Sequence, residues 1–148
     1  MMAKKQERTG TQTHAVSLIT LIDPSSPISE QYRTIRTNIQ FASSADKQIK
    51  TIVVTSSGPG EGKSTTSANL AVVFAKSGQR VLLVDADMRK PTVYKTFSLN
   101  NASGLSTVLS TSTSVLEAAQ KTVIDNLSVL TSGPKPPNPS ELLLSLIH

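Results

Sequence analysis

The chain has no cysteine and no tryptophan, and aromatic residues make up only 3% of its 148 residues. Without cysteine it can form no disulfide, no thiolate metal site and no thiol nucleophile. Its apolar runs are far shorter than the roughly 20 residues that cross a bilayer. No apolar segment long enough for a signal peptide follows the basic residues near its N-terminus. We therefore expect a soluble, cytoplasmic protein that is held at a membrane only through a partner.

The net charge of +5 is modest. No aromatic residues are interleaved with the basic ones, so we expect no nucleic-acid binding. A solvated tail and a solvated helix face would account for the positive charge equally well. We predict a disordered basic tail over residues 1–15 and one domain over residues 16–148. The basic residues that matter here form two clusters, Lys4, Lys5 and Arg8 in the tail and Arg33 and Arg36 beyond it.

A glycine-rich segment organises the rest of the chain. The β-branched run 51–55 predicts a strand, a glycine-rich turn follows, and residues 65–76 predict a helix. Strand, loop, Lys-Ser and helix in this order are typical of a phosphate-binding loop. The usual pattern has glycine where Ser57 stands, and Gly58 supplies flexibility one residue later. The alternative is a flexible turn with a surface lysine.

The predicted loop supplies the groups that a nucleotide needs. Its glycines let successive N–H groups point at one anion, and the start of the helix adds its positive end. Lys63 can reach the β- and γ-phosphates, and the Ser64 hydroxyl can bind Mg²⁺. The predicted nucleotide-binding residues are Ser57, Gly58, Pro59, Gly60, Glu61, Gly62, Lys63, Ser64 and Thr65.

A second strand is predicted over residues 80–84, where the run is apolar without alternation, as in a central parallel strand. It leads into Asp85 and Asp87. A right-handed crossover brings the ends of consecutive parallel strands to one edge of the sheet, so we expect both aspartates near the Lys63 loop and its metal. The alternative is that they cap a turn.

The remaining segments complete an α/β chain. We expect an amphipathic helix from residue 28 to about 43, with Ser26 as its cap and Pro27 in its first turn. The other expectations are an extended segment or edge strand at 16–22, an irregular stretch at 91–101, short helices at 104–110 and 114–120, a third strand at 126–131, an extended proline-rich segment at 133–139, and a last helix at 141–147 capped by Ser140.

Together these motifs resemble the bacterial tyrosine kinases. Residues 57–64 look like their Walker A motif, residues 82–91 like their Walker A′ motif, and residues 133–143 like a further family stretch. Glu30, Arg33 and Arg36 resemble the E-x-x-R-x-x-R motif of ring assembly. The resemblance implies a P-loop fold like that of MinD and ParA, with a parallel sheet and helices on both faces. Gly58 stands where the MinD/ParA branch has a second lysine, which favours the kinases.

The resemblance also implies a function. It indicates an autophosphorylating, ATP- and Mg²⁺-dependent protein-tyrosine kinase that regulates capsule and exopolysaccharide synthesis. The resemblance implies that Lys63, Asp85 and Asp87 are catalytic, with Lys63 on the phosphates. Asp85 would accept the tyrosine proton and Asp87 would act on the metal, but Ser64, Asp85 and Asp87 are all expected metal residues, because the sequence leaves the division between the two aspartates open. The implied partners are a transmembrane activator of the polysaccharide co-polymerase type, tyrosine substrates and further copies of the chain in a ring, in which Glu30, Arg33 and Arg36 form the interface.

Two family features are missing from the sequence. No apolar run ending in an acidic residue follows residue 131, where the Walker B motif is expected, and no tyrosine follows Tyr94. We therefore expect a kinase that is truncated, frameshifted or fragmentary at its C-terminus. Two alternatives stay open: a MinD/ParA-like ATPase switch, and a non-catalytic remnant that still binds nucleotide.

Overall fold

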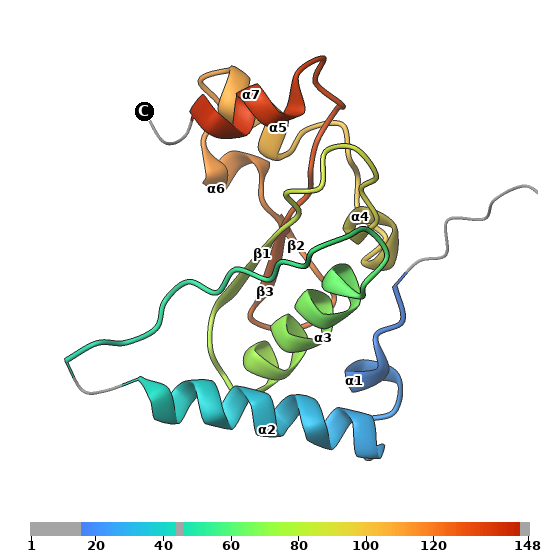
Figure 1. Cartoon of the computed structure of the whole chain (residues 1–148), viewed down its shortest axis with the longest axis vertical. Helices are drawn as coiled ribbons and strands as arrows, with labels where there is room; N and C mark the ends of the chain where they lie inside the picture. Colours follow the sequence, from blue (N-terminus) through green and yellow to red (C-terminus); the bar gives the residue numbers. More distant parts are fainter. Residues whose placement is uncertain (1–15, 44–45, 146–148) are drawn as a thin grey trace, which may run out of the picture.

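The computed structural model describes residues 16–43 and 46–145, so the predicted tail at 1–15 lies outside the described residues. Within them, three helices precede the first strand, and the two longest helices are among these three (Figure 1). In order, the elements are α1 (Ile19–Ile22), α2 (Pro27–Ala42), α3 (Lys63–Lys76), β1 (Val81–Val84), α4 (Val93–Thr96), α5 (Leu105–Ser110), α6 (Val115–Ala118), β2 (Gln120–Lys121), β3 (Leu127–Leu130) and α7 (Pro139–Leu144).

The strands form one small sheet in the order β1-β3-β2. β1 and β3 are parallel, with Val81 opposite Leu127 and Val84 opposite Leu130. The short β2 pairs antiparallel with β3. The predicted α/β class is confirmed, as are the strands expected near residues 80–84 and 126–131.

β1 is an edge strand of this sheet, so the expectation of a central strand is wrong. Its burial is one-sided: Leu83 is buried, whereas Leu82 and Val84 are 44% and 43% exposed. An apolar run without alternation predicts cover on both faces. In the structure α3 packs against β1, while Leu82 and Val84 on the other face stay exposed.

Residues 51–55 form no strand, which corrects the prediction made from their β-branched side chains. Val53 is 83% exposed and Ile52 is 46% exposed. A strand is defined by its pairing, and in the described part of the chain no strand pairs with this segment. In Figure 1 this segment is an unpaired trace that leads from α2 to the start of α3.

α3 is the centre of the core. Residues 68–75 are all buried, because the helix packs against α1, α2 and the sheet at once. Ala68, Ala71 and Val72 join Leu83 and Val129 of the sheet in the main cluster. The predicted helix is confirmed, with its start two residues earlier at Lys63 and its C-terminal cap at Ser77.

α2 begins as the sequence predicts. Pro27 is its first residue, and the Ser26 side chain accepts a hydrogen bond from the Ser29 N–H. Tyr32 and Ile39 pack against the cluster formed by Leu70, Val73 and Phe74 of α3. α2 is therefore fixed against the helix that follows the glycine-rich loop.

Four local expectations differ from the structure. Residues 19–22 form the single-turn α1 in place of a strand, and a short helix, α4, interrupts the stretch expected to be irregular. The two-residue β2 occupies the end of the segment expected to be helical. α7 begins at Pro139 with Asn138 at its N-cap position, so Ser140 lies inside the helix and does not cap it. Each involves one turn or less, where tertiary contacts outweigh local preference.

Candidate nucleotide-binding site

The glycine-rich loop runs directly into the N-terminus of α3. Gly62 is the N-cap residue, with φ of 86°, and Gly60 has φ of 71°. Residues that carry a Cβ rarely adopt such positive φ angles, so both positions favour glycine. Apart from the adjacent residues of the chain, a Cβ added at either glycine would meet no atom within 4 Å. The loop therefore has open space beside its backbone, where an anion can approach the helix terminus.

Lys63 is the first residue of α3, and its ammonium group is turned back onto the loop. Its Nζ donates to the Ser56 hydroxyl at 2.8 Å and to the Gly58 carbonyl at 3.2 Å. The Ser56 hydroxyl in turn donates to the Gly58 carbonyl at 2.8 Å. The lysine thus lies where it can exchange these neutral acceptors for the phosphate oxygens of a ligand.

Glu61 lies within the same loop and faces its donors. The Ser57 hydroxyl lies 3.3 Å from one Glu61 carboxylate oxygen and 3.5 Å from the other. A hydrogen bond from the Gly58 backbone is the main cause that lowers the pKa of this carboxyl, with smaller contributions from the nearby hydroxyls and from Lys63. The carboxylate is therefore stabilised as an anion by groups of the loop itself.

Asp85 follows β1 and is only 5% exposed. Its carboxylate accepts hydrogen bonds from the Asp87 N–H at 3.0 Å and the Val93 N–H at 3.4 Å. Burial raises the pKa of Asp85, although these backbone hydrogen bonds act in the opposite direction. A carboxylate that burial makes more basic is suited to accept a proton.

Asp87 is held in the turn that follows. Its carboxylate accepts hydrogen bonds from the backbone N–H groups of Arg89 at 3.2 Å and Lys90 at 2.9 Å. Both aspartates therefore make the turn contacts of the capping alternative. Among the described residues, no hydrogen bond or ion pair joins either aspartate to Lys63 or Ser64, so their expected proximity to the loop stays a prediction.

No motif in the sequence indicated the structural role of Asn69, a residue of the helix that follows the loop. Asn69 of α3 is fully buried, and its Oδ1 accepts hydrogen bonds from both the N–H and the hydroxyl of Thr20, at 3.1 and 2.8 Å. Its Nδ2 donates to the carbonyls of Ser17 and Thr65, at 3.0 and 2.9 Å. Asn69 thus fastens α1 to the first turns of α3. A single asparagine in an apolar helix has no motif that would have revealed this role.

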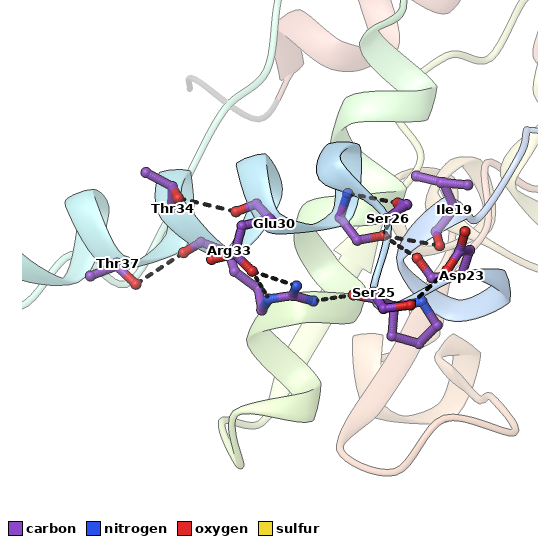
Figure 2. Close-up of polar contacts among 10 residues, drawn as sticks. Ile19, Asp23, Ser25, Ser26, Glu30, Arg33, Thr34 and Thr37 are labelled. Carbon is purple, nitrogen blue, oxygen red and sulfur yellow. Dashed lines mark hydrogen bonds and ion pairs between the residues drawn. The ribbon is translucent and has the colours of Figure 1, made fainter.

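The residues predicted to form an oligomer interface have partners within the chain. Glu30 and Arg33 form an ion pair at 2.6 Å, and the Arg33 guanidinium also donates to the Pro24 carbonyl at 2.6 Å (Figure 2). Figure 2 shows both contacts at the turn where α2 begins, next to the Ser26 cap. These contacts fix the N-terminal half of α2. Whether Glu30 and Arg33 also meet a second copy stays a prediction.

Arg36 points toward α3. One of its terminal nitrogens donates to the Val73 carbonyl at 3.1 Å, and its Nε is buried without a hydrogen-bond partner among the described residues. A cation beside the last carbonyls of a helix is favoured by the helix dipole. Arg36 therefore links α2 to the opposite end of the helix that starts at Lys63.

A groove of about 510 Å³ lies between α5, α7 and the proline-rich segment that precedes α7. The turn after β1 reaches this region, because the Arg89 guanidinium donates to the Ser140 hydroxyl at 3.1 Å. The residues that line the groove include Ser106, Thr107, Lys135, Pro136, Asn138 and Glu141. No residue of the phosphate loop lines it.

The loop, its helix and the parallel strand pair define a P-loop nucleotide-binding domain, and a family model described as an AAA domain matches residues 49–137. Over 129 residues the chain is 58% identical to the tyrosine-protein kinase YwqD of Bacillus subtilis, which covers 87% of this chain and 54% of YwqD. The solved chimerical protein CapA2B2 superposes with a TM-score of 0.78 and 49% identity, over 87% of this chain and 57% of that one. The BceF tyrosine kinase domain gives a TM-score of 0.76 and 41% identity, over 86% and 50%.

The chain therefore belongs to the bacterial tyrosine kinase family of AAA domains, as its motifs predict. These relatives favour the kinase interpretation over a MinD/ParA-like switch, and the family implies nucleotide binding. The chain spans about half the length of YwqD and a smaller share of several longer relatives. No helix in the described part of the chain is long and apolar enough to cross a membrane.

Proposed function

We propose that the chain is the nucleotide-binding part of an ATP-dependent protein-tyrosine kinase that autophosphorylates and regulates capsule and exopolysaccharide synthesis. The observation that carries this proposal is the open loop at the N-terminus of α3, with Lys63 and Ser64 as the first two helical residues. The sequence identity to proteins named tyrosine kinases supports this activity among those that use a nucleotide-binding loop.

The residues of the loop fit a triphosphate. Gly60 and Gly62 have positive φ angles and no side chain, and they leave room for phosphate oxygens close to the backbone. The Lys63 ammonium would bind the β- and γ-phosphates, and the backbone N–H groups of residues 58 and 60–65 would surround them. The ammonium's present acceptors are a hydroxyl and a carbonyl, which are weaker partners for a cation than phosphate oxygens.

The acidic residues fit Mg²⁺ by their chemistry. No group of three or more His, Asp or Glu gathers as a metal site in the described residues. Mg²⁺ in phosphoryl-transfer sites is usually bound by one or two carboxylates together with phosphates and waters. Ser64 and Asp87 would hold the ion, which would neutralise charge on the transferred phosphoryl group. Asp85, whose pKa burial raises, would accept the proton of the tyrosine hydroxyl.

The implied partners belong to the same proposal. The solved protein CapA2B2 is a chimera, and the relative CapB is called a putative tyrosine-protein kinase. We infer that this chain acts with a transmembrane activator of the polysaccharide co-polymerase type and that it assembles into a ring through Glu30, Arg33 and Arg36. The proposed location is the cytoplasm, at the membrane through that activator.

The test has two stages. In the first, calorimetry measures binding of MgATP and MgADP to the chain and to its Lys63→Met variant. In the second, the chain is incubated with labelled ATP, Mg²⁺, the cytoplasmic tail of the activator and a tyrosine substrate. Binding that depends on Lys63, followed by phosphotyrosine, supports the proposal; absence of nucleotide binding to the wild-type chain rejects it.

The second candidate is nucleotide binding without transfer. The unpaired segment 51–55 and the open edge of β1 favour it, because both lack the neighbouring strand that would fix the loop and the Asp85 turn relative to each other. Tight MgATP binding with no phosphotyrosine in the second stage would assign this function to the chain.

A further inference from the structure

The anion-binding groups of the loop are already in use within the loop. The Ser57 hydroxyl lies within hydrogen-bond distance of both Glu61 carboxylate oxygens, at 3.3 and 3.5 Å. Lys63, the cation of the site, donates to Ser56 and Gly58 of the same loop. An acidic side chain of the loop therefore occupies one donor of the loop, the Ser57 hydroxyl.

We propose that the Glu61 carboxylate is a built-in competitor for the donors of the phosphate loop, which a nucleotide must displace before its own phosphates bind. This inference rests on the proposed nucleotide function and adds to it a residue that sets nucleotide affinity. A carboxylate and a phosphate use the same donors, namely hydroxyls, backbone N–H groups and an ammonium.

The geometry places Glu61 on the approach to those donors. A Cβ at Gly58 would lie 3.3 Å from a Glu61 carboxylate oxygen, so the side chain lies directly over the loop backbone. The nearness of the Gly58 backbone, which is also the main cause that lowers the pKa of Glu61, agrees with this placement.

Displacement is sterically feasible and inexpensive. Glu61 is exposed, so its side chain can rotate into solvent without moving the backbone. The contact of Glu61 is solvent-exposed, and exposed pairs of this kind contribute little free energy. We therefore expect Glu61 to tune affinity and release rate, and not to block the site.

The experiment compares four proteins by calorimetry: the wild-type chain, Glu61→Gln, Glu61→Asp and the control Glu117→Gln. Glu61→Gln removes the charge, and Glu61→Asp keeps the charge but shortens its reach by one methylene. Glu117→Gln makes the same charge change in α6, where glutamine also suits the capping box with Ser114. The probes are MgADP and inorganic tripolyphosphate.

We expect Glu61→Gln and Glu61→Asp each to bind both probes about twofold to fivefold more tightly than wild type, with Glu117→Gln unchanged. The gain should be equal for the two probes, because the competition is for phosphate donors alone. If only Glu61→Gln gains affinity, the effect is through-space charge and the competitor role is wrong. Equal or weaker binding by both Glu61 variants also overturns it, and absence of binding by every protein overturns the proposed function as well.

Discussion

Replacing Asn69 by alanine is expected to destabilise the chain strongly, although no motif contains this residue. The substitution removes the acceptor for two donors of Thr20, which is itself only 2% exposed. Each buried donor left without a partner costs about 1–3 kcal/mol, and the better helix propensity of alanine returns about 0.6 kcal/mol. The carbonyls of Ser17 and Thr65 add less, because Ser17 is exposed and Thr65 keeps its helical hydrogen bond. With both donors of Thr20 unpaired, the net loss is about 1.5–5 kcal/mol.

The assay is urea unfolding followed by circular dichroism, with Asn38→Ala as the matched control. Asn38 is exposed on α2, so the same change there should leave the free energy of unfolding unchanged or slightly raised. Because whole domains are stable by only about 5–15 kcal/mol, the expected loss for Asn69→Ala is a large fraction of the total. A loss below about 1 kcal/mol would refute the assignment of Asn69 as the fastener between α1 and α3.

Three further predictions concern the site and its frame. Lys63→Met should weaken MgADP binding by about tenfold to a hundredfold, the worth of a charged hydrogen bond, whereas Lys121→Met on the exposed side of β2 should not; equal affinities in calorimetry would contradict this. Gly104→Ala should lower the free energy of unfolding by about 3 kcal/mol or more, because its Cβ would overlap the Thr131 carbonyl and the Gly133 amide. If the variant kept the urea midpoint of the wild type, the backbone would have moved to make room for the Cβ. Because burial raises the pKa of Asp85 above 3.8, the stability it contributes in acid is lost as pH rises through the raised pKa. The urea midpoint of Asp85→Asn should therefore rise relative to the wild-type midpoint as the pH is raised from acid to neutral. A difference between the two midpoints that does not change with pH would refute the burial effect.

The sequence predicted the two long helices well, because their information is local. Ser26 and Pro27 specify the start of α2, and the apolar run with Ser77 and Gly78 specifies the extent of α3. The same locality explains the error at residues 51–55. β-branched side chains favour extended backbone, but a strand also needs a neighbour, and the described chain provides none there.

The candidate site was predictable in its residues but not in its internal contacts. The pattern from Gly58 to Ser64 identified the loop and the position of Lys63. No pattern predicts that Glu61 faces Ser57 or that Asp85 accepts a hydrogen bond from Val93, because both depend on how the loop and turn settle in three dimensions. The buried Asn69 was invisible for the same reason.

The bare edge of β1 and the exposed run at 51–55 have a practical consequence for anyone handling this protein. Unpaired backbone flanked by isoleucine and valine is a template for another extended chain, so two molecules can add strands to each other. Such pairing follows mass action: dilute samples would remain monodisperse, while concentrated ones would gain apparent thermal stability and then precipitate. Melting temperatures of this chain should accordingly be compared only at one protein concentration.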